Sequence, residues 1–136
     1  MEIRDAIIDR VIDFWRALDR RDYEKLLSLV AEDCVWQREV LVSGRAAIGE
    51  ALSKRPSGLM TRHQITNLRV EGDRDSCSAA FLITTFGVLR SGEEDSPPDC
   101  GGPALVADGE MRFSIDGEMI LITRIAAEIV FLAPQK

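Results

Sequence analysis

The chain contains a single histidine, His63, at the start of a segment that is expected to be a β-strand. Imidazole is the side chain that titrates near neutral pH without help from its surroundings, so His63 is the first candidate for a general base. Asp19 is the candidate partner, because it lies one helical turn after Trp15 on an apolar stripe and therefore faces inward. A carboxylate that hydrogen-bonds one imidazole nitrogen fixes the tautomer of the ring and raises its basicity. Together the two residues predict proton-transfer chemistry.

Both residues also allow a purely structural interpretation. Asp19 would end its helix by accepting hydrogen bonds from backbone amides in the turn at residues 20–22, with Arg20 and Arg21 as counter-ions. A lone histidine at the start of a strand is more often a surface residue or a hydrogen-bonded core residue than a catalytic one. The sequence leaves these interpretations open beside the catalytic one.

Large apolar side chains on several expected elements could line a cavity for a flat apolar ligand. The candidate substrate-binding residues are Trp15, Trp36, Ile65, Phe81, Met111 and Phe113. Ile65 belongs to this set because it shares a strand face with His63. Ordinary core packing is the alternative interpretation for the tryptophans, the phenylalanines and Met111.

Composition and charge exclude several other classes of function. With one histidine and three widely spaced cysteines, the chain offers neither a zinc site nor a disulfide framework, and we expect no metal and no organic cofactor. The net charge of −6 is spread along the chain, and no basic stripe is present to bind nucleic acid. No segment approaches the ~20 apolar residues of a membrane span, and residues 1–10 lack the apolar core of a signal peptide. We therefore expect a cytoplasmic protein whose partner is a small apolar or aromatic molecule.

Helical periodicity dominates the first part of the chain. Apolar residues recur every three or four positions over residues 3–18, which predicts an amphipathic helix. Asp22 is a suitable N-cap for a second helix, which is expected to end near residue 33. A bent strand or small hairpin is expected over residues 34–42, followed by a third helix that starts at Ser43 and stops before Pro56.

The second half of the chain changes to the alternating periodicity of β-strands. Four strands are expected, paired antiparallel in sequence order, over residues 62–71, 76–89, 104–115 and 119–132. The pair Asp116-Gly117 suits a two-residue type I′ hairpin, whereas residues 90–103 predict a long mobile loop. The alternation changes phase near Thr66 and Asn67, which predicts a β-bulge where the sheet curls around a cavity.

These elements predict one α+β domain over residues 1–136, in which three N-terminal helices pack on a curved, mostly antiparallel sheet and enclose an apolar pocket. The strand over residues 76–89 is apolar on both faces, with Phe81 and Ile83 on one and Leu82 and Phe86 on the other. Helices can cover only one of these faces, so we expect a homodimer.

Several short motifs resemble the SnoaL-like branch of the nuclear transport factor 2-like superfamily. They are FWRALDRRDY at residues 14–23, AEDCVW at 31–36, GRAAI at 44–48, TRHQITN at 61–67 and the closing strand from ITR at 122–124 to Phe131. The resemblance covers nearly the whole chain and implies a cone-shaped, mixed sheet with an internal pocket. It also implies a range of activities, because this superfamily includes isomerases, cyclases and dehydratases as well as binding domains.

The resemblance separates two catalytic patterns. In the ketosteroid isomerase pattern the oxyanion tyrosine falls on Phe14 and the catalytic aspartate falls near Arg38, so neither group is retained. In the scytalone dehydratase pattern the aspartate that ends the first helix falls on Asp19 and the first histidine falls on His63. The second histidine of that pattern and the tyrosine before the aspartate are missing.

The resulting hypothesis is a SnoaL-like lyase or isomerase, of the dehydratase or cyclase type, in which His63 with Asp19 moves a proton on an apolar cyclic substrate. The alternative is a non-catalytic small-molecule-binding domain, or a structural small subunit, of the same fold. The missing tyrosine and second histidine favour this alternative. A cavity that His63 enters would favour the enzyme.

Overall fold

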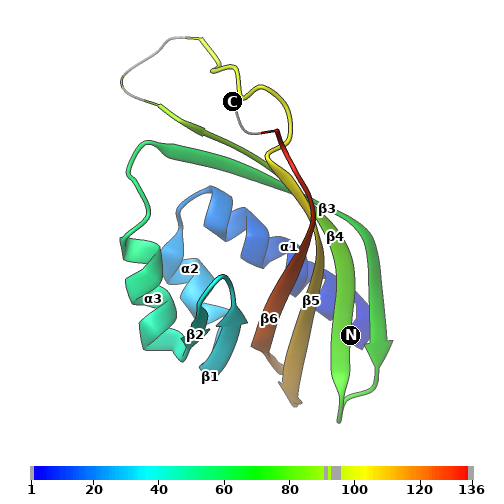
Figure 1. The fold of residues 1–136 in the computed structure, drawn as a ribbon. Coiled ribbons are helices and arrows are strands. Elements are labelled where there is room, and N and C mark those ends of the chain that lie inside the picture. Colours follow the sequence, from blue (N-terminus) through cyan, green and yellow to red (C-terminus); the bar gives the residue numbers. More distant parts are fainter. Residues whose placement is uncertain (1, 91, 93–95, 135–136) are drawn as a thin grey trace.

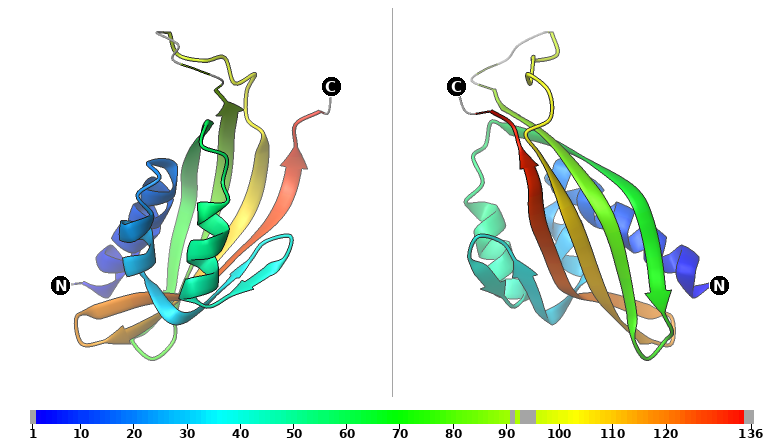
Figure 2. Two further views of the ribbon diagram at one scale, coloured as in Figure 1. Left: turned by 90° about the vertical axis from the view of Figure 1, so that its left-hand side faces the viewer. Right: turned by 45° about the vertical axis from the view of Figure 1, so that its right-hand side comes forward.

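A computed structural model describes residues 2–90, 92 and 96–134. Within them the chain forms three helices and six strands: two helices come first, then two strands, the third helix and the remaining four strands (Figure 1). In chain order these elements are α1 (Ile3–Asp19), α2 (Tyr23–Ser28), β1 (Val30–Gln37), β2 (Leu41–Ser43), α3 (Arg45–Ser53), β3 (Leu59–Gly72), β4 (Cys77–Leu89), β5 (Leu105–Asp116) and β6 (Met119–Leu132). The helices lie together on one face of a curved sheet, and no described helix covers the other face of β3 to β6 (Figure 2). This is the predicted α+β arrangement.

The second helix is shorter than predicted. Asp22 caps it as expected, because its side chain accepts a hydrogen bond of 3.2 Å from the backbone N–H of Lys25. Val30, however, belongs to β1, where it is fully buried and pairs in parallel with Ile122 of β6. A β-branched side chain gains more from this ladder than from another helical turn.

No helix among the described residues is long and apolar enough to cross a membrane.

The sheet has the strand order β2-β1-β6-β5-β4-β3. Strands β3 to β6 pair antiparallel in sequence order, as predicted, while β1 and β2 form the small hairpin expected over residues 34–42. The pairing of β1 with β6 is parallel, so the sheet is mixed. It remains open, with β2 and β3 at its edges, and this leaves room for the helices to close one side.

The predicted β-bulge lies in β3. Its register with β4 shifts between Thr66 and Arg69, and Asn67 takes a left-handed φ of 54°, a conformation that Asn tolerates better than most residues. The extra residue bends β3, as bulges do, at the part of the strand that follows His63.

The last hairpin turns one residue later than predicted. Asp116 still pairs with Met119, so Gly117 and Glu118 form the two-residue loop. Only Gly117 has a positive φ, at 61°, which is the pattern of a type II′ turn rather than type I′.

The long loop predicted over residues 90–103 lies partly outside the described residues, because positions 91 and 93–95 are not described. Its described residues form no helix or strand. The predicted mobility of this loop stays a prediction.

The core lies between the helices and the concave face of the sheet. Phe14, Trp15 and Trp36 pack edge to face at its centre. Gly109 on β5 is a necessary part of this packing, because a Cβ atom there would lie 2.4 Å from a ring carbon of Phe81. The missing side chain lets the phenyl ring lie flat against the β5 backbone.

Candidate active site

Asp19, the last residue of α1, and His63, on β3, are joined by a hydrogen bond of 2.5 Å between Asp19 Oδ1 and His63 Nδ1. A carboxylate can only accept, so Nδ1 carries the proton of this hydrogen bond, and in the neutral ring Nε2 keeps its lone pair. The backbone N–H of His63 donates to Asp19 Oδ2 at 2.8 Å, so one carboxylate holds both the ring and the main chain of His63. Both side chains are largely buried, with exposed fractions of 8% for Asp19 and 10% for His63. The alternative in which Asp19 bonds the backbone amides of residues 20–22 is wrong.

Thr61 supplies the third hydrogen bond to the carboxylate, because its hydroxyl donates to Asp19 Oδ1 at 2.9 Å. Burial alone would raise the pKa of Asp19, but the hydrogen bonds from His63, the charge of its ring and the hydroxyl of Thr61 together lower that pKa below its usual value. Asp19 is therefore an anion at neutral pH. The three hydrogen bonds also offset its position at the negative end of α1, which costs about 0.3–1 kcal/mol.

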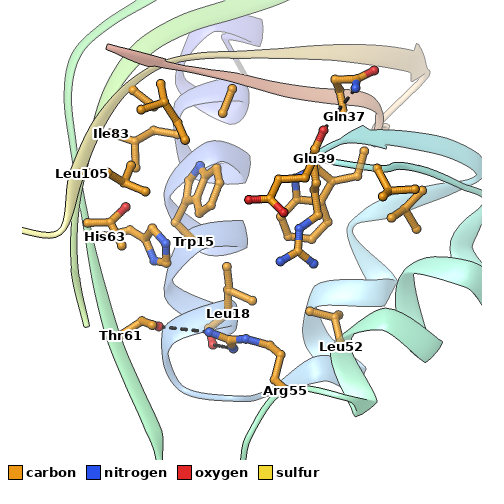
Figure 3. A pocket seen from close by; sticks show the side chains of 18 residues that line it. Trp15, Leu18, Gln37, Glu39, Leu52, Arg55, Thr61, His63, Ile83 and Leu105 are labelled. Atoms are coloured by element: carbon orange, nitrogen blue, oxygen red, sulfur yellow. Dashed lines mark hydrogen bonds between the residues drawn. The ribbon is translucent and has the colours of Figure 1, made fainter. Parts of the chain in front are cut away.

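Arg55, which follows α3, connects this cluster to the helices. It donates from Nη1 to the hydroxyl of Tyr23 at 2.9 Å. It also donates from Nη2 to the hydroxyl of Thr61 at 3.3 Å (Figure 3). Thr61 can accept from Arg55 while it donates to Asp19, so its hydroxyl is oriented from both sides. A continuous chain of hydrogen bonds thus runs from Tyr23 through Arg55, Thr61 and Asp19 to His63 and fixes the position of the imidazole.

The other side of His63 faces a cavity of about 560 Å³, which has a mostly apolar wall (Figure 3). Nε2 has no hydrogen-bond partner among the described residues and is not fully buried. The cavity is lined by Trp15, Leu18, Trp36, Gln37, Arg38, Glu39, Val40, Val42, Leu52, Arg55, Thr61, His63, Ile83, Thr85, Leu105, Ala107, Ala127 and Ile129. Its volume falls within the range of about 300–1,000 Å³ that is usual for small-molecule sites.

A second, more polar cavity of about 400 Å³ lies on the Asp19 side of the pair. Asp19, His63 and Trp15 contribute to its wall together with Ile65, and its remaining lining residues are Ile12, Arg16, Arg20 and Arg62. His63 and Trp15 therefore stand between the two cavities. Within the described part of the chain, no three His, Cys, Asp or Glu side chains gather as a metal site would require.

The structure divides the predicted substrate-binding residues into two groups. Trp15 and Trp36 line the larger cavity, and Ile65 lines the smaller one. Phe81, Met111 and Phe113 line neither; they are 4%, 0% and 7% exposed and belong to the packed core. The cavity is lined on β4 and β5 by Ile83, Thr85, Leu105 and Ala107, whereas Phe81, Met111 and Phe113 lie further toward the other end of this strand pair.

Several residues of the site were missed in the sequence. Arg55 and Thr61 reach the pair through tertiary hydrogen bonds that no local pattern reveals. Gln37, Arg38 and Glu39 are a polar interruption of the apolar pattern over residues 34–42, and none of them was proposed as a site residue. The hairpin between β1 and β2 that they form nevertheless contributes to the cavity wall. Such an interruption marks a turn at the end of a sheet, which is where ligand sites are often built, so a signal was present.

Comparison with known proteins gives a consistent assignment of fold. The family model of the SnoaL-like domain matches residues 1–115. A type 2 hexachlorocyclohexane dehydrochlorinase (LinA) is 18% identical, with a TM-score of 0.79 over 98% of this chain and 88% of that chain. A candidate scytalone dehydratase from Novosphingobium aromaticivorans is 16% identical, with a TM-score of 0.77 over 98% of this chain and 87% of that one.

A protein from Catenulispora acidiphila, solved in complex with S-DNPA, is 17% identical, with a TM-score of 0.70 over 90% of each chain. No curated protein sequence matches the chain. The solved structures show the shared fold at these low identities, and the family model covers most of the chain. The chain belongs to the SnoaL-like domain family.

Proposed function

We propose that the protein is a small-molecule lyase or isomerase in which His63 transfers a proton and Asp19 orients it. The observation that carries this proposal is the Asp19–His63 hydrogen bond, which leaves Nε2 unbonded and facing a cavity. A buried carboxylate that holds Nδ1–H stabilises the imidazolium formed when Nε2 takes a proton. The alternative interpretation of His63 as an exposed surface residue does not fit its 10% exposure.

The reaction begins when Nε2 takes a proton from the carbon next to a substrate carbonyl. The electron pair of the C–H bond forms a C=C bond while the π pair of the C=O bond moves to the oxygen, which gives an enolate. In a lyase, the enolate re-forms the carbonyl and expels a hydroxyl from the β-carbon, and this hydroxyl takes the proton from the imidazolium and leaves as water. In an isomerase, the enolate is conjugated with a C=C bond, and the proton returns to the far carbon of that system as the carbonyl re-forms. Neither route requires a metal, an oxidant or an organic cofactor, because His63 is restored at the end of each cycle.

The substrate in this proposal is a small apolar or aromatic cyclic molecule. Trp15 and Trp36 provide flat apolar surfaces in the larger cavity, and Ile65 extends the apolar wall on the far side of His63. The names of two structural neighbours, a dehydrochlorinase and a candidate dehydratase, describe eliminations, which are reactions of the proposed class.

The test is turnover of cyclic ketones, hydroxylated aromatic compounds and related polyketide-like molecules. His63→Ala is expected to lower kcat by about 10²–10⁴, the range for losing a positioned acid or base. Asp19→Asn is expected to lower kcat less, because the carboxylate orients the ring and does not itself take the proton. Asp9→Asn, which removes an exposed charge from the same helix, is the matched control and is expected to leave the rate unchanged.

Full activity of His63→Ala on a true substrate would refute this mechanism. Ligand binding without turnover, unchanged in both variants, would instead support a non-catalytic binding domain. That result would mean that the hydrogen-bonded pair stabilises the cavity wall rather than moving protons.

The proposed assembly is a homodimer that covers the outer face of the sheet. Phe131 and Val106 are register partners on this face, beside Thr84, and Phe131 is 66% exposed. Leu82 and Phe86 lie along the same face of β4, which no described helix covers (Figure 2). Asp108 and Glu128 continue the row of Leu82 across the same face, so the apolar side chains there alternate with charged ones. Exposed large apolar side chains such as Phe131, on a sheet face without a covering helix, motivate the proposed interface.

A further inference from the structure

Three arginines line the smaller cavity, which lies on the Asp19 side of the Asp19–His63 pair. Arg16 belongs to the last turn of α1, Arg20 is the C-cap residue four positions later, and Arg62 precedes His63 on β3. The helix side and the strand side of the cavity therefore both carry positive charge. All three arginines are exposed, so a dissolved anion can reach them from solvent.

These three charges have no counter-ion in the protein. Within the part of the chain that the structure describes, no carboxylate forms an ion pair with any of them. Arg62 donates one hydrogen bond, to the carbonyl oxygen of Thr61 at 2.7 Å, and the side chains of Arg16 and Arg20 donate none among the described residues. Like charges four positions apart on a helix repel each other, so this arrangement disfavours the helix unless an anion binds.

Among the described residues Asp19 is the one carboxylate in the wall of this cavity, and it does not neutralise the arginines. Its two oxygens accept hydrogen bonds from the ring and the backbone of His63 and from the hydroxyl of Thr61. With a neutral imidazole, three positive charges against one negative charge leave the wall with a formal charge of +2, in a chain whose net charge is −6. Such a local excess attracts anions.

The dipole of α1 accounts for only part of this cluster. Cations in the last turn of a helix interact favourably with its negative end, which is a structural reason for Arg16 and Arg20. Arg62 belongs to β3, an edge strand of the sheet, and lies outside the turn over which the dipole acts. A ligand that binds all three arginines accounts for the whole cluster.

The same cavity offers apolar surface beside the arginines. Ile12 lies four positions before Arg16 on α1 and is 38% exposed, and Ile65 contributes from β3. A ligand that fills this space would therefore combine an anionic group with a small apolar group.

We propose that this cavity is a second ligand site, which binds a phosphate monoester that carries a small apolar group. Guanidinium groups bind phosphate oxygens through paired N–H donors, and a phosphate dianion matches the formal charge of the wall, whereas a carboxylate carries a single charge. The volume of about 400 Å³ falls in the range of small-molecule sites. The site is separate from the larger cavity, so the inference holds whether or not His63 performs the proposed reaction.

Calorimetry in phosphate-free buffer at about pH 8, where the monoester is a dianion, tests the ligand class with four probes. Phenyl phosphate is expected to bind most tightly, because it alone offers a dianion and an apolar ring together. Phenol lacks the charge, benzoate carries only one negative charge, and inorganic phosphate lacks the ring. Equal affinity of any of these three and phenyl phosphate, or no binding of phenyl phosphate at millimolar concentration, would overturn the proposal.

Matched arginine variants test the place of binding. Arg16→Gln, Arg20→Gln and Arg62→Gln are each expected to weaken phenyl phosphate binding roughly 3- to 10-fold. Arg4→Gln and Arg69→Gln remove the same charge from exposed positions of α1 and β3 that line neither cavity, and they should leave the affinity unchanged. Equal losses in all five variants would indicate a general attraction between charges and would overturn the site.

Two further variants test the apolar contact and the choice of cavity. Ile12→Ala is expected to weaken phenyl phosphate roughly 2- to 5-fold and to leave the affinity for inorganic phosphate unchanged. Undiminished phenyl phosphate binding in Ile12→Ala would refute the apolar contact. Arg38 lines only the larger cavity, so a loss of affinity in Arg38→Gln without a loss in Arg16→Gln would place the phosphate in that cavity and overturn the proposal.

Discussion

Replacing Asp19 by Asn keeps the size of the side chain but removes one of the two acceptor oxygens that hold His63. The carboxylate accepts three hydrogen bonds: from the His63 ring at 2.5 Å, from the His63 backbone N–H at 2.8 Å and from the Thr61 hydroxyl at 2.9 Å. An Asn side chain must turn its NH₂ group toward at least one of these donors. Losing one hydrogen bond to a charged group costs about 1.5–3 kcal/mol, and relief at the C-terminal end of α1 returns about 0.3–1 kcal/mol. The expected net loss in unfolding free energy is about 0.5–2.7 kcal/mol.

The pH dependence of this loss follows from the lowered pKa of Asp19. A carboxyl group whose pKa is lower in the folded state stabilises the fold at pH values above its unfolded pKa, near 3.8. That contribution disappears as the pH falls through the lower folded pKa. The stability gap between the parent protein and Asp19→Asn should therefore be full at about pH 5 and should narrow below about pH 4.

Urea unfolding, followed by tryptophan fluorescence, measures this gap at each pH. The midpoint should fall in Asp19→Asn while the slope m stays the same, because the surface exposed on unfolding does not change. Asp9→Asn provides the control for removing an exposed carboxylate from α1. A variant as stable as the parent at pH 6, or a gap that widens below about pH 4, would show that the carboxylate does not hold His63 as described.

Two further predictions concern the sheet. Gly109→Ala should lower the unfolding free energy by about 1–3 kcal/mol, because the new methyl group would meet the Phe81 ring at 2.4 Å. Gly87→Ala is the control and should change stability by less, because its methyl group would have no contact closer than 3.6 Å. Equal urea midpoints for the two variants would contradict this packing. Sedimentation at micromolar concentration should give a dimer for the parent chain and a monomer for Phe131→Glu, while a monomeric parent would contradict the proposed interface.

Local sequence patterns predicted the order and type of most elements because each signal acts over a few residues. The helical stripe of α1, the cap at Asp22, the four strands β3 to β6 and the bulge at Asn67 all agree with the structure. The end of α2 was wrong because Val30 is held by a parallel partner that lies far along the chain, and no local pattern reports such a partner. The hairpin between β5 and β6 was predicted one residue too early and with turn type I′ instead of II′. The reason is similar, because the pairing of the two strands sets the register.

The candidate site was predictable only in part. Asp19 and His63 could be paired because helical spacing placed one inward and strand alternation placed the other on the inner face. The boundary between cavity wall and packed core was not predictable: the sequence left both positions open for Phe81, which lies in the core and lines neither described cavity. That boundary depends on how completely neighbouring side chains fill space, which residue type does not determine.

The single histidine limits the reactions that this site can perform. If His63 is the base, no second imidazole exists to supply the acid, and the other carboxylate on the cavity wall, Glu39, is exposed in the hairpin loop. The imidazolium can then return its proton to the substrate or to the leaving group within the same cycle. Elimination and isomerisation meet this condition, because each takes one proton and gives it back. Reactions that need a base and a separate acid at the same moment do not, so the number of histidines points to the same reaction classes as the geometry around Nε2.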